Sequence, residues 1–294
     1  MYNKITMLRS VHEIVPAKIN LHLKVNEKRA DGFHGIESIF QKVPLYDEIL
    51  IEMADSKNTC KIYSPVFKLP QNNTLFSAYT AFCAATGIDV GVNVTLTKRI
   101  PSGAGMGGGS SDAAGMLRGL QKLFGVSLTD AELRKAAETI GSDVSFFLYD
   151  GKEYDTAIVT GRGENVKYIE SRRDLYYVLV CPGVHSSTKE AYDLVDNWNN
   201  GDCTAFPKLT ELEAIYRSSA KSWTFCNSFT KPVAWKYPVI QKAIQDLKDT
   251  FPDFVEMTGS GSVVFGIFSS ENDAKKAYTQ LCQNWKESYL LKPN

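Results

Sequence analysis

The chain of 294 residues is long enough for one large domain or for two ordinary ones. Hydrophobic residues make up 44% and charged residues 22%, which is typical of a globular protein. The 33 basic and 33 acidic residues cancel, so the composition points neither to a nucleic-acid partner nor to an anionic membrane surface.

The cysteines and the N-terminal residues predict a cytoplasmic protein. None of the six cysteines lies in a CxxC pair, which argues against a zinc site or a redox motif. A chain of this length buries a core without disulfide bridges, so we expect reduced thiols. The first residues lack the apolar segment of a signal peptide, and no apolar run is as long as a membrane span.

The chain up to residue 100 predicts mostly strands. Alternating apolar and polar residues indicate the strands, and Ala, Leu and Phe at helical spacing indicate one helix. The strands are expected at 14–25, 49–53 and 92–100, the helix at 73–86, and a turn at 26–35.

Helices dominate the middle of the chain, and strands and a helix follow towards its end. The pair Thr129 and Glu132 forms a capping-box pattern that opens a helix ending at Gly141. Other helices are expected at 110–124 and 271–285, a strand at 176–180, and a strand–turn–strand at 257–268. Because strands and helices do not alternate strictly, the fold class is predicted as α+β. A Gly- and Arg-rich stretch, Thr160–Glu164, is a candidate junction between domains at 1–164 and 165–294.

The segment Pro101–Asp112 is the strongest functional signal. Five glycines leave its backbone uncovered and allow positive φ, so that successive N–H groups can form a concave anion site. The helix that follows adds its N-terminal amides and dipole, and two serines can supply hydroxyls to phosphate oxygens or to a metal. The segment therefore predicts polyphosphate binding by Pro101, Ser102, Gly103, Ala104, Gly105, Met106, Gly107, Gly108, Gly109, Ser110 and Ser111.

Three other interpretations of this segment are weaker. A flexible Gly/Ser linker seldom lies directly between a strand and a helix. The residues Gly103, Gly105 and Gly108 match GxGxxG, but a dinucleotide fold needs a second strand ending in an acid about 20 residues later, and a helix is expected there. A Walker A loop would end in Gly-Lys-Ser/Thr, which this segment lacks.

Two charged residues suit phosphoryl transfer to an alcohol. Such a reaction needs an acceptor oxygen in line, neutralisation of the γ-phosphate and often a base. Asp143 follows a predicted helix, where it could be a base or an ordinary turn residue. Lys18 lies in an alternating strand, where it could be catalytic or a solvated side chain.

These segments resemble the GHMP kinases. The ATP loop of that family is similar to P-x-G-x-G-x-G-G-S-S, which Pro101–Ser111 matches almost residue for residue. The family also carries a C-terminal glycine motif, which Met257–Phe265 fits through Gly259, Ser260 and Gly261, although these residues alone could form a hairpin turn. The two matches in the family's order are more specific than either one.

Within the family, the chain resembles the subfamily that phosphorylates 4-diphosphocytidyl-2-C-methyl-D-erythritol. That subfamily has P-A-K-x-N-L-x-L, then R-A-D-G-Y/F-H, then the glycine loop, then L/I-G-A-D-V-P-F-F. This chain has Pro16–Leu23, Arg29–His34, the loop and Ile140–Phe147 at the matching places, with serine at 142 and 145. The R-A-D-G-F-H match is the most diagnostic, because mevalonate, homoserine and galactose kinases lack it.

The resemblance implies a role for each matching residue. Asp143 would take the proton from the 2-hydroxyl of the substrate, and Lys18 would hold both that carboxylate and the transferring phosphoryl group. Asn20 would contact the methylerythritol end. Phe33 and Tyr192 would stack on the cytosine, and His34 would contact the edge of the base. The implied cosubstrate is ATP with Mg²⁺, which stays mostly on phosphates and water.

The resemblance also implies the architecture, namely an N-terminal domain like domain 2 of ribosomal protein S5 and a ferredoxin-like C-terminal domain. Asp112 replaces the family's usual Asn, and Asn227-Ser228 replaces a usual Asn-Asp pair, so the roles of these positions stay open. Two rival functions remain: another GHMP kinase of the mevalonate or homoserine type, and a non-catalytic nucleotide-binding regulator, which would have lost Lys18 or Asp143.

Overall fold

The computed structural model describes residues 8–65, 69–198 and 206–293. The N-terminal residues considered above and Cys203 lie outside these ranges. The chain forms two compact units. The first unit comprises residues 1–17, 45–100 and 107–150, and the second comprises residues 18–44, 101–106 and 151–294. The division at residue 164 that the sequence suggests stays a prediction. None of the helices in the described ranges is long and apolar enough to cross a membrane.

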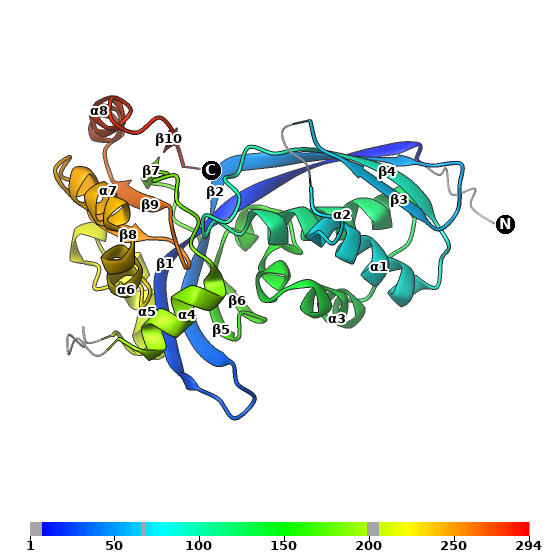
Figure 1. Cartoon of the computed structure of the whole chain (residues 1–294), viewed down its shortest axis with the longest axis horizontal. Helices are drawn as coiled ribbons and strands as arrows, with labels where there is room; N and C mark the ends of the chain where they lie inside the picture. The colour runs from blue at the N-terminus through cyan, green and yellow to red at the C-terminus, as the bar shows by residue number, and fades with distance from the viewer. Residues whose placement is uncertain (1–7, 66–68, 199–205, 294) are drawn as a thin grey trace. The chain divides into compact units, whose positions relative to one another are not determined.

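The first unit is a layer of strands covered by helices. Its strands are the start of β1 (Ser10–Lys28), the end of β2 (His34–Met53), β3 (Thr59–Tyr63) and β4 (Gly91–Thr97). Strand β4 pairs in parallel with β3 and antiparallel with β2, and β1 pairs with β2. Figure 1 shows the helices α1 (Thr74–Thr86), α2 (Gly108–Phe124) and α3 (Asp130–Ile140) on one side of these strands. A short 3-10 helix, η1 (Ser142–Phe147), packs against α2 and α3.

Capping residues place the helices of the first unit. The side chain of Asn73 accepts a hydrogen bond from the Phe76 amide at the start of α1. The capping box predicted for Thr129 and Glu132 is confirmed at the start of α3. Helix α2 has no side-chain cap; it begins directly after Gly107, whose φ of 69° only glycine adopts easily. The amides at the start of α2 are therefore left without a capping side chain.

The second unit contains two groups of strands. In one, β5 (Thr156–Gly161) pairs antiparallel with both the start of β2 and β6 (Asn165–Ile169). The stretch Thr160–Glu164, which the sequence suggested as a domain junction, comprises the end of β5 and the turn to β6. The other group is a four-stranded antiparallel sheet in the order β10-β7-β9-β8. Its strands are β7 (Tyr176–Val180), β8 (Phe254–Met257), β9 (Val264–Phe268) and β10 (Ser288–Leu291).

The four-stranded sheet has ferredoxin-like topology. Helix α7 (Pro238–Lys248) lies between β7 and β8 in the chain, and α8 (Glu271–Leu281) lies between β9 and β10; both helices pack on the sheet (Figure 1). The chain order β-α-β-β-α-β with this strand order is the ferredoxin-like arrangement that was predicted. The remaining elements of the unit are η2 (Lys152–Tyr154), α4 (Thr188–Asp196), η3 (Leu209–Glu211), α5 (Leu212–Arg217), η4 (Ala220–Ser222) and α6 (Thr230–Lys236).

Several boundaries differ from the sequence predictions. Strand β2 starts at His34, whereas alternation indicated only 49–53, and β1 extends to Lys28. Strand β4 ends at Thr97 and not near Ile100, because the amides of Arg99 and Ile100 donate to the Asp47 carboxylate instead of a neighbouring strand. Helix α8 ends at Leu281, where the amides of Asn284 and Trp285 both donate to the Leu281 carbonyl.

Candidate functional site

The first half of the glycine loop, Pro101–Met106, is anchored in the second unit by three hydrogen bonds to its backbone. The Lys18 amide donates to the Met106 carbonyl at 2.9 Å, and the Val263 amide donates to the Ala104 carbonyl at 3.3 Å. The Thr258 hydroxyl lies 3.1 Å from the Gly105 carbonyl oxygen. These three bonds engage carbonyl oxygens of the loop and none of its N–H groups.

The two glycine motifs predicted from the sequence are in direct contact. A Cβ atom at Gly105 would lie 2.1 Å from the Thr258 carbonyl oxygen, and one at Gly259 would lie 2.9 Å from the Gly105 Cα. Both residues also have positive φ, 78° and 57°. The C-terminal motif is therefore more than a hairpin turn between β8 and β9, because only glycine lets these two backbones approach so closely.

Asn227 supports the C-terminal motif through its side chain. Its side-chain amide donates to the carbonyls of Met257 and Gly259, at 2.8 Å each, and the side chain is buried. Ser228 links the same segment to β1, because its amide donates to the Leu23 carbonyl and its hydroxyl accepts from the Val25 amide. The departure Asn227-Ser228 thus keeps a structural role at the motif.

The second half of the loop, Gly107–Ser111, opens helix α2 in the first unit. The first amides of an α-helix have no partner within the helix, and together with the helix dipole they favour an anion. The Ser111 hydroxyl donates to the Pro16 carbonyl at 2.6 Å, which ties the first turn to β1. This geometry can bind phosphate oxygens through backbone N–H groups.

Lys18 and Asn20 form a fixed polar pair on β1 in the second unit. The Lys18 Nζ donates to Asn20 Oδ1 at 2.7 Å and lies 4.5 Å from the centre of the Phe40 ring. The Asn20 side chain in turn donates to the Ser38 hydroxyl at 3.1 Å. Lys18 and Asn20 are both buried, 4% and 1% exposed. A buried ammonium with such defined contacts is a positioned charge, unlike the solvated strand lysine considered as the alternative.

Asp143 lies in the first turn of η1, directly after α3, in the first unit. The carbonyl of Phe147, at the other end of η1, accepts a 2.6 Å hydrogen bond from Arg118 Nη1 on α2. Arg118 is itself buried and paired with Glu13. These contacts fix the backbone that carries Asp143. The pairing of Asp143 with Lys18 stays a prediction.

The residues predicted to bind cytosine are partly brought together. The rings of His34 and Tyr192 stack with their centres 5.1 Å apart and an angle of 19° between the planes. The His34 Nδ1 lies 2.9 Å from the Asn26 carbonyl, and its Nε2 lies 3.2 Å from Asp196 Oδ1. Phe33 is 55% exposed, and the Arg162 guanidinium carbon lies 4.9 Å from the centre of its ring. Phe33 therefore offers an accessible aromatic surface for a ligand.

A buried charge cluster at the start of α2 was not foreseen from the sequence. Lys98 Nζ forms an ion pair with Asp47 Oδ2 and another, 2.9 Å long, with Asp112 Oδ2. Gly108 lies against the ammonium, since a Cβ there would be 2.7 Å from Lys98 Nζ. Burial raises the pKa of Asp112 to about 7, although the attraction of Lys98 acts in the opposite direction. Asp112 was noted only as a departure from the family, and Asp47 carries no local signal because it is 51 residues from Lys98.

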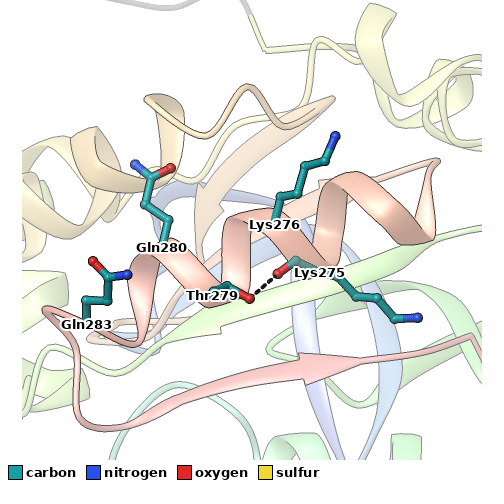
Figure 2. Close-up of a pocket in the computed structure, with 5 residues that line it drawn as sticks. All are labelled: Lys275, Lys276, Thr279, Gln280 and Gln283. Carbon is teal, nitrogen blue, oxygen red and sulfur yellow. Dashed lines mark hydrogen bonds between the residues drawn. The ribbon is translucent and has the colours of Figure 1, made fainter.

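A pocket on α8 has none of these features. Figure 2 shows its lining, which consists of Lys275, Lys276, Thr279, Gln280 and Gln283. The Thr279 hydroxyl donates to the Lys275 carbonyl at 2.9 Å, and the two lysine side chains point apart (Figure 2). It has no glycine loop and no carboxylate, so the glycine loop remains the candidate site.

Comparison with known proteins places these features in a family. Residues 73–151 match the description "GHMP kinases N terminal domain", and residues 205–287 match "GHMP kinases C terminal". A relative from Treponema pallidum subsp. pallidum, named 4-diphosphocytidyl-2-C-methyl-D-erythritol kinase, is 40% identical over 92% of this chain and 94% of its own length. A relative of the same name from Thermotoga maritima is 39% identical over 86% of this chain and 90% of its own length.

Solved structures agree with the sequence relatives. A crystal structure titled 4-(cytidine 5'-diphospho)-2C-methyl-D-erythritol kinase superposes with a TM-score of 0.80 and 30% identity, covering 96% of this chain and 98% of that one. Homoserine kinase from Cytophaga hutchinsonii superposes with a TM-score of 0.75 at 17% identity, covering 100% and 98%, and shares the fold. The predicted α+β, two-domain kinase architecture is confirmed.

Proposed function

The chain belongs to the GHMP kinase family, and from that premise we propose that it transfers the γ-phosphate of ATP to the 2-hydroxyl of 4-diphosphocytidyl-2-C-methyl-D-erythritol. The observation that carries the proposal is the alignment with a relative of that name at 40% identity over 92% of the chain. The segment Arg29–His34 supports the same substrate. The reaction is a step towards isoprenoid precursors by the non-mevalonate route.

The glycine loop is proposed to bind the polyphosphate of ATP, the cosubstrate that membership of a kinase family implies. Its residues Pro101–Met106 carry no charged side chain, so backbone amides supply most of the contacts. No group of three His, Cys, Asp or Glu in the described ranges could hold a metal ion. Mg²⁺ is therefore proposed to arrive on the ATP phosphates with its remaining ligands from water, the coordination that this ion commonly keeps.

Two charged side chains are proposed to carry the chemistry. Asp143 takes the proton of the 2-hydroxyl while the oxygen of that hydroxyl forms the new bond to the γ-phosphorus. The bond between the γ-phosphorus and the bridging oxygen breaks in line, and that oxygen leaves with ADP. Lys18 stabilises the negative charge on the transferring group. Its contacts with Asn20 and Phe40 support this role, because a preoriented charge needs no reorganisation during the reaction.

The cytidine end is proposed to bind at Phe33, His34 and Tyr192. The exposed ring of Phe33 supports stacking of the base, which contributes about 1–3 kcal/mol per aromatic ring. The Asn26 carbonyl orients His34 through Nδ1, so a contact between Nε2 and the base edge would take the place of the Asp196 contact. Asn20 is proposed to contact the methylerythritol end. The place of action is proposed to be the cytoplasm, with a small molecule and not a nucleic acid or a membrane as the partner.

The test is ADP release with ATP, Mg²⁺ and 4-diphosphocytidyl-2-C-methyl-D-erythritol, comparing the wild type with Asp143→Asn. Rapid turnover of this acceptor, with mevalonate and homoserine inactive, is expected. In Asp143→Asn, kcat should fall by about 10²–10⁴, the usual contribution of a general base. Turnover that survives in the variant would remove Asp143 from the chemistry. No turnover in folded, ATP-binding protein would overturn the substrate.

A further inference from the structure

His185 lies on the segment between β7 and α4, and its ring rests against the ATP loop. A Cβ atom at Gly103 would lie 2.3 Å from His185 Nδ1 and 2.4 Å from its Cε1. The imidazole therefore occupies the space that a side chain at position 103 would fill. Gly103 is one of the residues proposed above to bind the ATP polyphosphate, so His185 is in contact with that loop.

The segment that carries His185 is fixed to the C-terminal glycine motif. The Ser262 hydroxyl donates to the Val184 carbonyl at 2.5 Å, and the hydroxyls of Thr188 and Ser260 lie 3.2 Å apart. The same motif contacts Gly105 of the loop. Residues on both sides of His185 thus contact the motif that also anchors the loop, which positions the histidine relative to Gly103.

The chemistry of the ring suits an anion. In the described part of the chain, no hydrogen bond or ion pair engages the His185 side chain, and the residue is exposed. A neutral imidazole carries one N–H donor and an imidazolium carries two, and phosphate oxygens accept such bonds. Because Pro101–Met106 have no charged side chain, a donor from outside the loop would add to what its amides provide.

We propose that His185 is a further phosphate-binding residue of this kinase, donating a ring N–H to a phosphate oxygen held at the Pro101–Met106 loop. The inference rests on the proposed function, since it assumes a phosphorylated ligand at the loop. The phosphate can belong to ATP or to the diphosphate of the acceptor, and the experiment separates these two sources.

The experiment measures the dissociation constants of ATP, tripolyphosphate and adenosine by calorimetry, and KM for both substrates, in His185→Ala and His185→Gln. A lost hydrogen bond to phosphate should weaken ATP and tripolyphosphate binding about 3–10-fold, leave adenosine unchanged and leave kcat within about twofold. Gln retains an N–H donor and should recover part of the affinity. His12→Ala is the control, because His12 is an exposed histidine that pairs with Glu48 in the first unit.

A rise in KM for the acceptor alone, with ATP binding unchanged, would assign the same contact to the acceptor diphosphate. Affinities of all phosphorylated ligands equal to those of the wild type would overturn the proposal, as would equal losses for adenosine and tripolyphosphate. ATP and tripolyphosphate binding are measured without turnover. If the proposed acceptor is not turned over, the effect of the His185 variants on ATP and tripolyphosphate binding can still be interpreted. If the His185 variants have no effect on binding, the proposed acceptor is not called into question.

Discussion

At the scale of single residues, Lys18 shows how a strand lysine becomes a fixed charge. Its ammonium is buried, donates to Asn20 and lies over the Phe40 ring. Desolvating a lysine is costly unless its charge is satisfied, and these contacts offset that cost. Local alternation could not reveal this, because it favours an outward, solvated side chain equally well.

Replacing Lys18 by Met should therefore lower kcat by about 10²–10³, the typical effect of losing one preorganised group that stabilises the transition state. Steady-state kinetics with saturating ATP would measure it. Lys24→Met is the matched control, since Lys24 lies on the same strand and pairs with Glu37. A Lys18→Met enzyme with wild-type kcat would contradict the role given to Lys18.

Among the site residues, those in contiguous motifs could be predicted and those joined by the fold could not. The loop Pro101–Ser111 and the motif Gly259–Gly261 are recognisable because the close approach of their backbones requires glycine at fixed positions. The cluster of Asp47, Lys98 and Asp112 was not predicted, since Asp47 precedes Lys98 by 51 residues and Lys98 and Asp112 lie on opposite sides of the glycine loop. His185 escaped for the same reason, as its contact is with Gly103.

At the scale of elements, the contact between the two glycine motifs is the main feature that holds the loop in position. Gly259 and Gly105 approach so closely that any side chain at Gly259 would displace the loop backbone. Three hydrogen bonds then keep the loop in place. The loop conformation thus depends on a segment more than 150 residues away.

Gly259→Ala should therefore weaken ATP binding more than tenfold, because the added Cβ would push Gly105 out of position. Gly87→Ala is the control, since Gly87 also has positive φ but has open space around its Cα. It should lose about 1–2 kcal/mol of unfolding free energy through backbone strain and keep its affinity for ATP. Calorimetric titration with ATP and urea unfolding of both variants would measure this. Equal affinities in the two variants would show that the contact does not shape the loop.

Helices were predicted more reliably than long strands, and the reason is physical. Caps such as Asn73 and the Thr129–Glu132 box are local signals that fix where a helix begins. Strand β2 is buried on both faces over Ser38–Val43, so alternation disappears there and only its last residues looked like a strand. The end of β4 was set by tertiary hydrogen bonds to Asp47 that no local pattern contains.

At the scale of the whole molecule, two buried groups give opposite dependences of stability on pH. Burial lowers the pKa of His22 from 6.5 to about 4, with Lys24 adding to the effect. His22 therefore binds a proton in the unfolded chain but not in the folded chain between these two pH values. Stability is lost as pH falls from 6.5 towards 4. Burial raises the pKa of Asp112 from 3.8 to about 7, so its folded form keeps a proton that the unfolded chain releases, and stability is lost as pH rises from about 4 to 7.

The pH ranges over which His22 and Asp112 affect stability overlap between pH 4 and 6.5. The effects of the two groups on the free energy of unfolding therefore oppose each other there in the wild type. Each contributes a slope of at most about 1.4 kcal/mol per pH unit. His22→Phe fills the space between Phe206 and Phe225 without a titrating group, so it should lower the slope of unfolding free energy against pH by about 1 kcal/mol per unit. Asp112→Asn should raise that slope by a similar amount.

Urea unfolding at pH 4.5, 5.5 and 6.5 measures all three slopes, and constant offsets from lost contacts do not affect them. Parallel lines for the wild type and both variants would show that the pKa of neither group differs between the folded and the unfolded chain. Slopes that diverge in opposite directions would establish that burial of His22 and of Asp112 balance each other across this pH range.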